Sequence, residues 1–353
     1  MPDWTKSMEQ SFEYYIVDPG TWRDKSKLKN ILSGSKIERD LSAETLGSAT
    51  FNMSEPIDEC YIRAYLITRQ NGITERFPLG TFLVQTQKTQ FDGTYAKTPV
   101  DAYTPLLELK ENPPPLGYSI MKDSNVMEYA YRLTREQVRA PVIKVSTDEK
   151  LYSNFVANTD DTWLTFISDL ITNAKYELGL DELSQVIYLP EQDVESLQPV
   201  WEFNDDDNSI LYPDISTDRD MYGIPNVVEV SYSLSNVNFF ARVVNDDPNS
   251  PVSTVNRGRQ ITYRVTNPEF AGEPTDEQIQ LYAKNLLDKL SSIEYTVTFS
   301  HGYCPVRLGD CVRLNYKRAN MYGVKAKITK QSIELKPGCP ITETAVFTKN
   351  LWR

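Results

Sequence analysis

Histidine is almost absent from this chain, which limits the chemistry open to it. His301 is the single histidine among 353 residues. Catalysis that pairs a serine or cysteine nucleophile with a histidine base would have to use this residue. It opens a His-Gly-Tyr-Cys turn after a strand-like run, with no nucleophile motif beside it. We therefore predict a structural role for His301 and no catalytic residue in the chain.

Cysteine is also scarce, with only Cys60, Cys304, Cys311 and Cys339. The first residues lack a basic segment followed by an apolar one, so we expect no secretory signal and free thiols. His301 and the last three cysteines could form a zinc site, but the gap from Cys304 to Cys311 is wider than usual for a ligand pair. A Cys304–Cys311 disulfide across a hairpin is the other alternative. We predict no metal and no cofactor.

Positive charge and long apolar runs are lacking too. Lys and Arg number 37 against 49 Asp and Glu, a net charge of -12. Broad binding to nucleic-acid phosphates needs a basic face, so this balance argues against it. No run of about 18 apolar residues occurs, so we expect no membrane-spanning helix. Four basic residues recur at every second position and would share one face of an extended segment, which we interpret as a solvated face: Arg23, Lys25, Lys27 and Lys29.

One acidic run resembles a calcium loop at first sight. It is Asn204–Ser209, with Asp214, Asp218 and Asp220 following. It lacks the central glycine and the terminal glutamate of the EF-hand pattern. We predict a solvated acidic loop, and whether Asp205–Asp207 hold an ion stays open. Carboxylates are abundant elsewhere, but no two are singled out as a glycosidase pair.

Strand patterns dominate residues 1–110. A protein of this length suggests two or three domains. Tyr61–Arg69 is rich in β-branched and aromatic residues, and Asn71-Gly72 after it is a strong hairpin signal. Phe77–Gly80 bends the backbone into a further strand. Pro99, inside the next strand-like run, predicts an edge strand or a broken one. This spacing of short strands favours a barrel or a sandwich over βαβ units.

Helical patterns mark the middle of the sequence. Asn112–Pro115 interrupts regular structure, and Asp123 or Ser124 is expected to cap a helix that ends near Arg135. A stronger helix is predicted over Thr159–Tyr176. Its apolar stripe is Trp163, Phe166, Ile167, Leu170, Ile171 and Ala174.

Residues 201–353 return to strands, with one helix. Thr275 and Gln278 form a capping box for a helix that continues to Leu290, and Ile293–Phe299 then alternates as a strand. The predicted fold class is α+β, mainly β. We expect a first β domain at 1–110, a helix-containing middle domain at 111–200 and a second β domain at 201–353.

Three segments together resemble the hub proteins of phage tail tips and baseplates. The first, Asp161–Leu178, is a helix in the middle of the sequence that leads into a strand. The second, Pro225–Arg259, is a strand with the polar loop that follows it. The third, Thr275–Asp310, is a capped helix followed by a strand and a Leu-Gly-Asp turn. The resemblance covers residues 155–320 well and the first β domain by architecture only.

The resemblance implies a specific role. A protein of this family has two β-barrel tube domains, and three copies form a ring that adapts a six-fold tail tube to a three-fold tip. Expected partners are a distal tail or tail tube protein, the tape measure protein, and a tip, spike or fibre protein, with DNA passing through unbound. The protein would be made in the host cytoplasm and reside in the virion. Because Trp352-Arg353 follows the last predicted strand directly, we expect a bare hub.

Two other functions stay open at this point. A tail-associated cell-wall hydrolase or endopeptidase would need a catalytic segment, which the sequence does not reveal. A receptor-binding glycan module is suggested only by the 11% aromatic content. Those aromatic residues lie mostly at alternating or helical-stripe positions, which core packing explains better.

Overall fold

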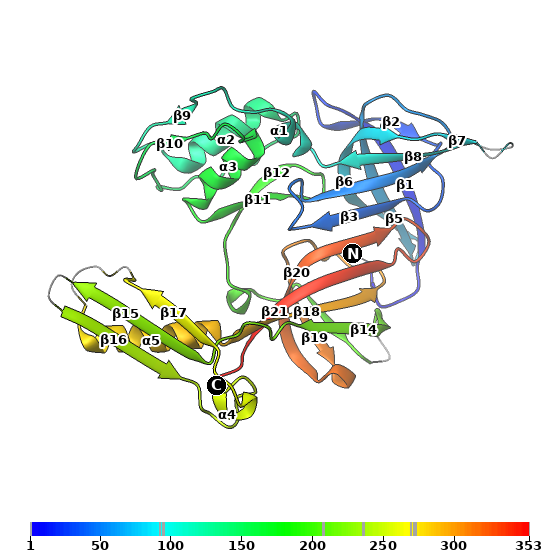
Figure 1. Cartoon of the computed structure of the whole chain (residues 1–353). Helices are drawn as coiled ribbons and strands as arrows, with labels where there is room; N and C mark the ends of the chain where they lie inside the picture. Colours follow the sequence, from blue (N-terminus) through cyan, green and yellow to red (C-terminus); the bar gives the residue numbers. More distant parts are fainter. Residues whose placement is uncertain are drawn as a thin grey trace. The chain divides into compact units, whose positions relative to one another are not determined.

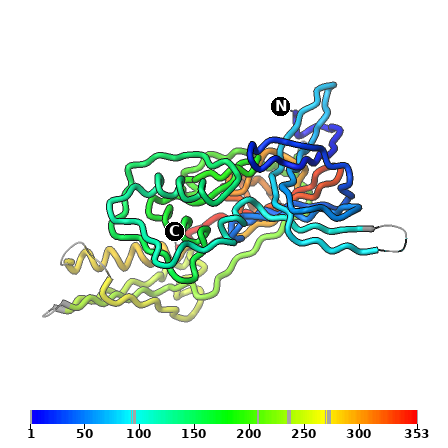
Figure 2. Tube along the Cα trace, turned by 90° about the horizontal axis from the view of Figure 1, so that it is seen from above, coloured from blue at the N-terminus to red at the C-terminus, as the bar shows by residue number. Residues whose placement is uncertain are grey.

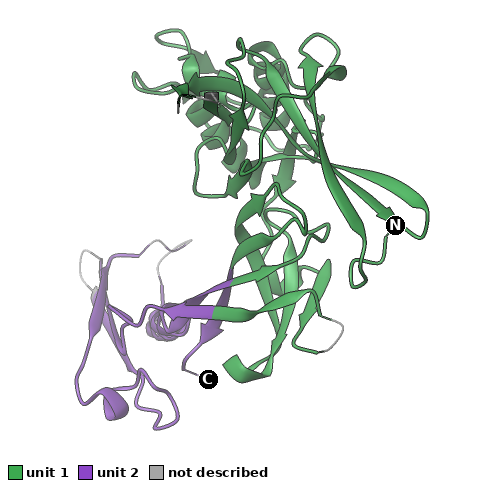
Figure 3. Ribbon diagram, turned by 90° about the vertical axis from the view of Figure 1, so that its right-hand side faces the viewer, with its two compact units in different colours: residues 1–215, 299–344 green, residues 216–298, 345–353 purple. Residues whose placement is uncertain are grey.

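The computed structural model of the protein describes residues 2–91, 93, 96–206, 209–234, 237–268, 270 and 274–352. They divide into two compact units (Figure 3): unit 1 comprises residues 1–215 and 299–344, and unit 2 comprises residues 216–298 and 345–353. Strands outnumber helices, which confirms the predicted mainly-β, α+β class. The three predicted domains stay a prediction, since compactness does not establish which segments fold independently.

Unit 1 contains most of the helices and strands, many of which are labelled in Figure 1. Their bounds are β1 (Glu9–Asp18), β2 (Arg23–Leu28), β3 (Lys36–Asp40), β4 (Gly47–Met53), β5 (Tyr61–Gln70), β6 (Ile73–Gln87), β7 (Gln90–Phe91), β8 (Ala96–Tyr103), α1 (Leu107–Glu111), β9 (Ser119–Ile120), α2 (Val126–Gln137), β10 (Phe155–Val156), α3 (Trp163–Thr172), β11 (Tyr176–Leu180), β12 (Val186–Pro190), η1 (Val194–Ser196), β13 (Trp201–Asn204), β19 (Cys311–Tyr316), η2 (Lys317–Ala319) and β20 (Met321–Glu334). Three strands run from one unit into the other: β14 (Leu211–Arg219), β18 (Ser292–His301) and β21 (Ile341–Asn350).

The expected hairpin at Asn71-Gly72 joins β5 and β6. Asn71 and Gly72 have φ angles of 52° and 78°, the left-handed values that a two-residue hairpin turn requires. The bend expected at Phe77–Gly80 does not end the strand, because β6 continues through it as a bulge. Ala64 pairs with Gly80 and Tyr65 with Pro78, so Leu79 is the extra residue.

The two predicted β domains do not close into separate barrels, and this part of the prediction is wrong. Strand β20 pairs with β3 antiparallel, from Lys330 opposite Asp40 to Glu334 opposite Lys36. Strands from both regions belong to one sheet, whose main path is β14-β18-β21-β20-β3-β4-β8-β6-β5-β1-β2. Figure 2 shows blue N-terminal and orange C-terminal strands beside each other. Their buried side chains share one core, which includes Phe51 and Ile333.

Because of Pro99, strand β8 was expected to be an edge strand or a broken one, and the edge position is wrong. Strand β8 pairs with β4 on one side and with β6 on the other. The last β6 pair is Gln87 with Val100, so Pro99 lies just beyond it. The missing N–H of proline therefore removes no pair from this ladder.

Two amphipathic helices fill the middle segment. The stripe of α3 is buried as predicted, although the helix is shorter and begins after Thr162, which caps it. Helix α2 is capped by Asn125 in place of the expected Asp123 or Ser124, because the Asn125 side chain accepts a hydrogen bond from the Glu128 N–H. Both helices share a buried core with Trp22 and Tyr61 of the first β region.

Unit 2 is a three-stranded sheet packed against one helix. Its elements are β15 (Val227–Leu234), β16 (Val237–Val244), α4 (Thr254–Arg257), β17 (Thr262–Thr266) and α5 (Asp276–Leu290), with strand order β16-β15-β17. The predicted capping box of α5 is confirmed, with Thr275 and Gln278 bonded reciprocally. Among the described residues, every helix is too short or too polar to span a membrane.

Candidate functional site

The β6 bulge creates a polar attachment point on the sheet. Gly80 has φ +128°, and a Cβ atom there would lie 2.8 Å from the Phe82 ring, so glycine suits this position. The bulge interrupts the ladder and leaves backbone groups free to bind elsewhere. The Leu79 carbonyl accepts from Arg39 Nη2 at 2.9 Å, and the Thr81 N–H donates to Ser184 Oγ at 2.8 Å.

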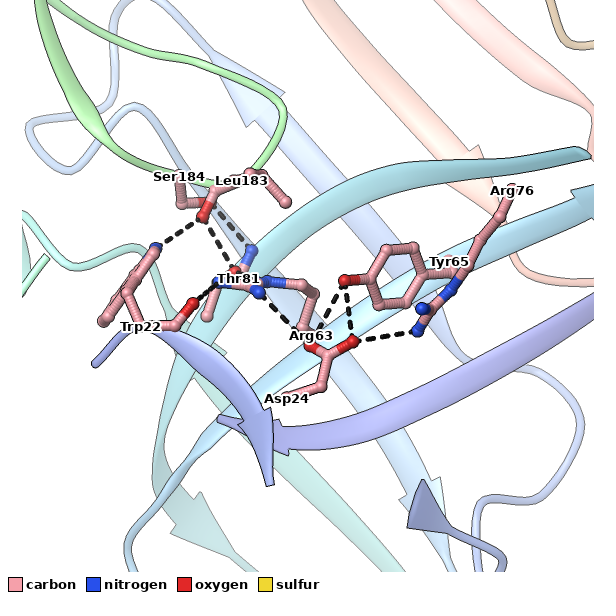
Figure 4. Close-up of polar contacts among 8 residues, drawn as sticks. All are labelled: Trp22, Asp24, Arg63, Tyr65, Arg76, Thr81, Leu183 and Ser184. Carbon is pink, nitrogen blue, oxygen red and sulfur yellow. Dashed lines mark hydrogen bonds and ion pairs between the residues drawn. The ribbon is translucent and has the colours of Figure 1, made fainter. Parts of the chain in front are cut away.

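Ser184 belongs to the turn between β11 and β12. Hydrogen bonds within this turn hold its conformation. The Asp181 carboxylate accepts from the backbone N–H groups of Leu183 and Gln185. The Leu183 carbonyl then accepts from Trp22 Nε1 at 3.0 Å and from Thr81 Oγ1 at 2.9 Å (Figure 4). The middle segment is thus bonded to the first β region through an ordered turn.

Arg63 holds the sheet side of this attachment. Its side chain is almost fully buried, and it donates to Thr81 Oγ1 at 2.7 Å, the Trp22 carbonyl at 3.2 Å and Asp24 Oδ1 at 3.2 Å (Figure 4). Asp24 also accepts from Tyr65 and from Arg76. A buried cation needs a carboxylate and filled donor positions, and Arg63 has both.

A cavity of about 280 Å³ lies beside the attachment. Its wall combines the β11–β12 hairpin with both β regions, and charged residues contribute to it: Arg39, Arg307 and Lys327 against Glu177, Asp181, Glu182 and Asp310. Arg307 and Glu182 form an ion pair. Burial raises the pKa of Asp310. Since the described wall residues include neither histidine nor cysteine, the cavity lacks the usual nucleophile–base pairs.

His301 lies in a second buried network. Its Nε2 atom is 3.3 Å from Glu343 Oε1, and both side chains are fully buried. Gln331 Nε2 donates to the same Glu343 oxygen at 2.9 Å, while Arg39 Nη1 donates to Gln331 Oε1 at 2.9 Å. Glu343 Oε2 is buried and has no partner among the described residues. The histidine thus lies between a core carboxylate and the Cys304 thiol, and all three side chains are buried.

The four residues considered as alternative zinc ligands were His301, Cys304, Cys311 and Cys339. Cys304 Sγ lies 3.9 Å from His301 Nδ1. In the described part of the protein, no group of three or more His, Cys, Asp or Glu side chains is placed to hold a metal ion. All four cysteines are free in this structure. Burial raises the pKa of Cys339 to about 12 and that of Cys60 to about 11, which disfavours their thiolates.

The acidic candidates are dispersed. Asp205 accepts a hydrogen bond from the Lys317 N–H, and Asp220 accepts one from the Tyr222 N–H. Asp214 and Asp218 lie in β14. Asp207 and Asn208 are outside the described residues.

The basic candidates are all exposed, as expected for solvated side chains, but they do not share one face, and that part of the prediction is wrong. Arg23, Lys25 and Lys27 lie in β2 and Lys29 follows it. Ile16 pairs with Ser26 and Val17 with Asp24, so Lys25 is a bulged residue. The bulge shifts the alternation and places Arg23 and Lys27 on opposite faces.

Comparison with known proteins defines the fold. No protein-family model and no curated protein sequence matches this one. Solved structures do match it over nearly its whole length, and two of them are tail proteins, so the protein has the fold of these tail proteins. The resemblance predicted from the sequence is therefore confirmed at the level of fold.

The particular structures are the following. The tail protein from Neisseria meningitidis MC58 matches with a TM-score of 0.63 and 11% identity, covering 97% of this chain and 98% of that one. The 43 kDa tail protein of prophage MuSo2 from Shewanella oneidensis matches with a TM-score of 0.61 and 10% identity, covering 95% and 98%.

Proposed function

We propose that this chain is a structural virion protein, the hub of a phage tail tip or baseplate. The observation that carries the proposal is the match to two tail proteins, each along at least 95% of this chain. A match confined to one domain would support a shared module only. The whole-length match supports a shared role in the tail.

In this role the protein acts as a homotrimeric adaptor between a six-fold tail tube and a three-fold tip. Two β regions per protomer, 1–110 and 201–353, give six tube-like surfaces in a trimer, with the middle segment 111–200 beside them. The β3–β20 pairing holds strands of the two regions in one sheet, which favours a constant spacing of those surfaces. The distal tail or tube protein binds above, and the tip, spike or fibre protein binds below.

The ring encloses a channel for the tape measure protein and DNA. A net charge of -12 favours passage of DNA without adhesion to the wall. We propose no enzymatic activity, which is supported by the complete burial of His301, Cys304 and Glu343, out of reach of a substrate. The protein is made in the host cytoplasm and resides in the virion.

Cryo-electron microscopy of the assembled tail tip tests this proposal. We expect three copies of the protein around the tail axis, between six-fold and three-fold density. Native mass spectrometry of the protein with its neighbouring tail protein should give the same stoichiometry. Location away from the axis, or a monomer in both experiments, would refute the hub. Clearing of host cell wall in zymograms would refute the non-enzymatic role.

A further inference from the structure

The cavity beside the β11–β12 hairpin has an apolar wall that the protein leaves partly uncovered. Its apolar residues come from the hairpin, the first β region and the turn before β19: Leu178, Ile187, Leu41, Phe82 and Leu308. All of them except Phe82 are only half-buried. The volume of about 280 Å³ holds ~nine water molecules at ~30 Å³ each. Because apolar surface is hydrated unfavourably, the cavity favours an apolar occupant.

Arg39 contributes a positive charge to the same wall. Its Nη1 and Nη2 atoms donate to Gln331 Oε1 and to the Leu79 carbonyl, both at 2.9 Å and both neutral acceptors. It forms no ion pair among the described residues, and three of its five N–H donors have no acceptor there. Burial lowers the pKa of Arg39, and the charge of nearby Arg307 acts in the same direction. The guanidinium is therefore held in place but lacks a counter-ion.

The carboxylates of the wall do not supply that counter-ion. Glu182 forms an ion pair with Arg307. Asp181 accepts from two backbone N–H groups of its own turn. Asp310 accepts from the Arg307 N–H, and burial raises its pKa more than the two arginines of the wall lower it, which disfavours its ionised form. Glu177 is exposed to solvent. An anion that enters the cavity would therefore meet an unpaired guanidinium.

We propose that this cavity binds a small amphipathic carboxylate, an apolar chain with one terminal acid group. The carboxylate accepts from the free N–H donors of Arg39, and the chain lies against Leu178, Ile187 and Leu308. A carboxylate matches a guanidinium in charge and in its two acceptor oxygens. Since a methylene group and a water molecule are of similar size, a chain of ~eight carbons fits. The whole site lies in unit 1, and it goes beyond the proposed hub role without depending on it.

Isothermal titration calorimetry of the full-length protein tests the head group. The probe is octanoate, and the matched control ligand is octan-1-ol, which has the same chain without the charge. We expect octanoate to bind at least ~tenfold more tightly, the effect of a hydrogen bond to a charged group. Arg39→Met should abolish this difference and leave octanol binding unchanged, which also shows that the variant is folded.

Two further variants test the place of binding. Lys327→Met removes an equal charge from the same wall, but no hydrogen bond fixes that ammonium group among the described residues. It should weaken octanoate binding by less than ~twofold, because a mobile, half-exposed charge is screened by solvent. Leu178→Trp fills the cavity and should abolish the binding of both ligands. This variant tests the site even where Arg39→Met does not fold.

Four results would overturn the proposal. The first is no heat of binding with octanoate. The second is equal affinity for octanoate and octanol, which would make the cavity a purely apolar one. The third is equal weakening by Lys327→Met and Arg39→Met, which would replace a specific contact by general electrostatics. The fourth is unchanged binding in Leu178→Trp, which would place the ligand elsewhere. Because the assay uses the isolated protein and a free ligand, none of these results bears on the proposed tail role.

Discussion

Two arginines, the buried Arg63 and the half-buried Arg39, reach their carboxylates differently. Arg63 contacts Asp24 directly, and that carboxylate has further donors in Tyr65 and Arg76. Arg39 is linked to the buried Glu343 only through the Gln331 amide. In the direct pair, the arginine and the carboxylate stabilise each other without an intervening side chain. A relayed pair depends on one neutral side chain, and it leaves Glu343 Oε2 unpartnered among the described residues.

The largest effect is expected from Arg63→Ala. It removes the buried cation and leaves the Trp22 carbonyl without this donor, so we expect a loss of about 3–4 kcal/mol in the free energy of unfolding. Urea denaturation measures it. The control is Arg76→Ala, on the same carboxylate but 39% exposed, with an expected loss of about 1 kcal/mol. Equal losses would show that burial does not distinguish the two arginines.

Gly80→Ala tests the bulge that serves both networks, through Leu79 to Arg39 and through Thr81 to Arg63. The added Cβ meets the Phe82 ring at a strained φ, so we expect a loss of about 2–3 kcal/mol. Gly72→Ala is the matched control, because its φ is +78° but nothing lies within 4 Å. It should cost about 1 kcal/mol. Similar thermal shifts for both variants would contradict a specific role for the bulge.

Gln331→Leu cuts the relay and should cost about 1–2 kcal/mol, since Arg39 and Glu343 each lose a partner. Lys330→Ala, one residue earlier on β20 and about half exposed in its side chain, should change stability by under about 0.5 kcal/mol. Chemical denaturation of both variants makes the comparison. A loss as large as that of Arg63→Ala would show that relayed and direct pairs are equally robust.

The smallest effect is expected from Asp310→Asn, which should increase the free energy of unfolding. Burial raises the folded pKa of Asp310 above its usual value of 3.8. The contribution of protonated Asp310 to the free energy of unfolding is therefore complete below pH 3.8 and is lost as the pH rises through the pKa of the folded state. At pH 7 the ionised carboxylate is therefore unfavourable, and asparagine keeps the acceptor for the Arg307 N–H. The gain should shrink toward acidic pH in denaturation curves; a gain independent of pH would contradict the assignment.

Sequence patterns predicted the local elements and missed the long-range ones. The α5 capping box and the β5–β6 hairpin depend on residues a few positions apart, so their signals are complete within the segment. The β3–β20 pairing joins residues about 300 apart and leaves no local trace. Closed barrels were expected because short strands at this spacing favour a barrel or a sandwich over βαβ units.

The buried networks were also missed, although signals existed. Arg63 lies inside the apolar run Tyr61–Leu66, where a charge implies a buried partner. Gly80 lies within a strand, where glycine often marks a bulge. The partners Asp24 and Ser184 could not be inferred, because only folding brings them near.

The β3–β20 pairing also has a consequence for biosynthesis. Lys36–Asp40 emerge early from the ribosome, yet their partners at Lys330–Glu334 are translated near the end. Until β20 has been translated, the edge of β3 that pairs with it has no partner strand, so the β3–β20 hydrogen bonds form late. An incomplete nascent polypeptide presents that edge to its neighbours, and a stalled or shortened product would be prone to aggregation.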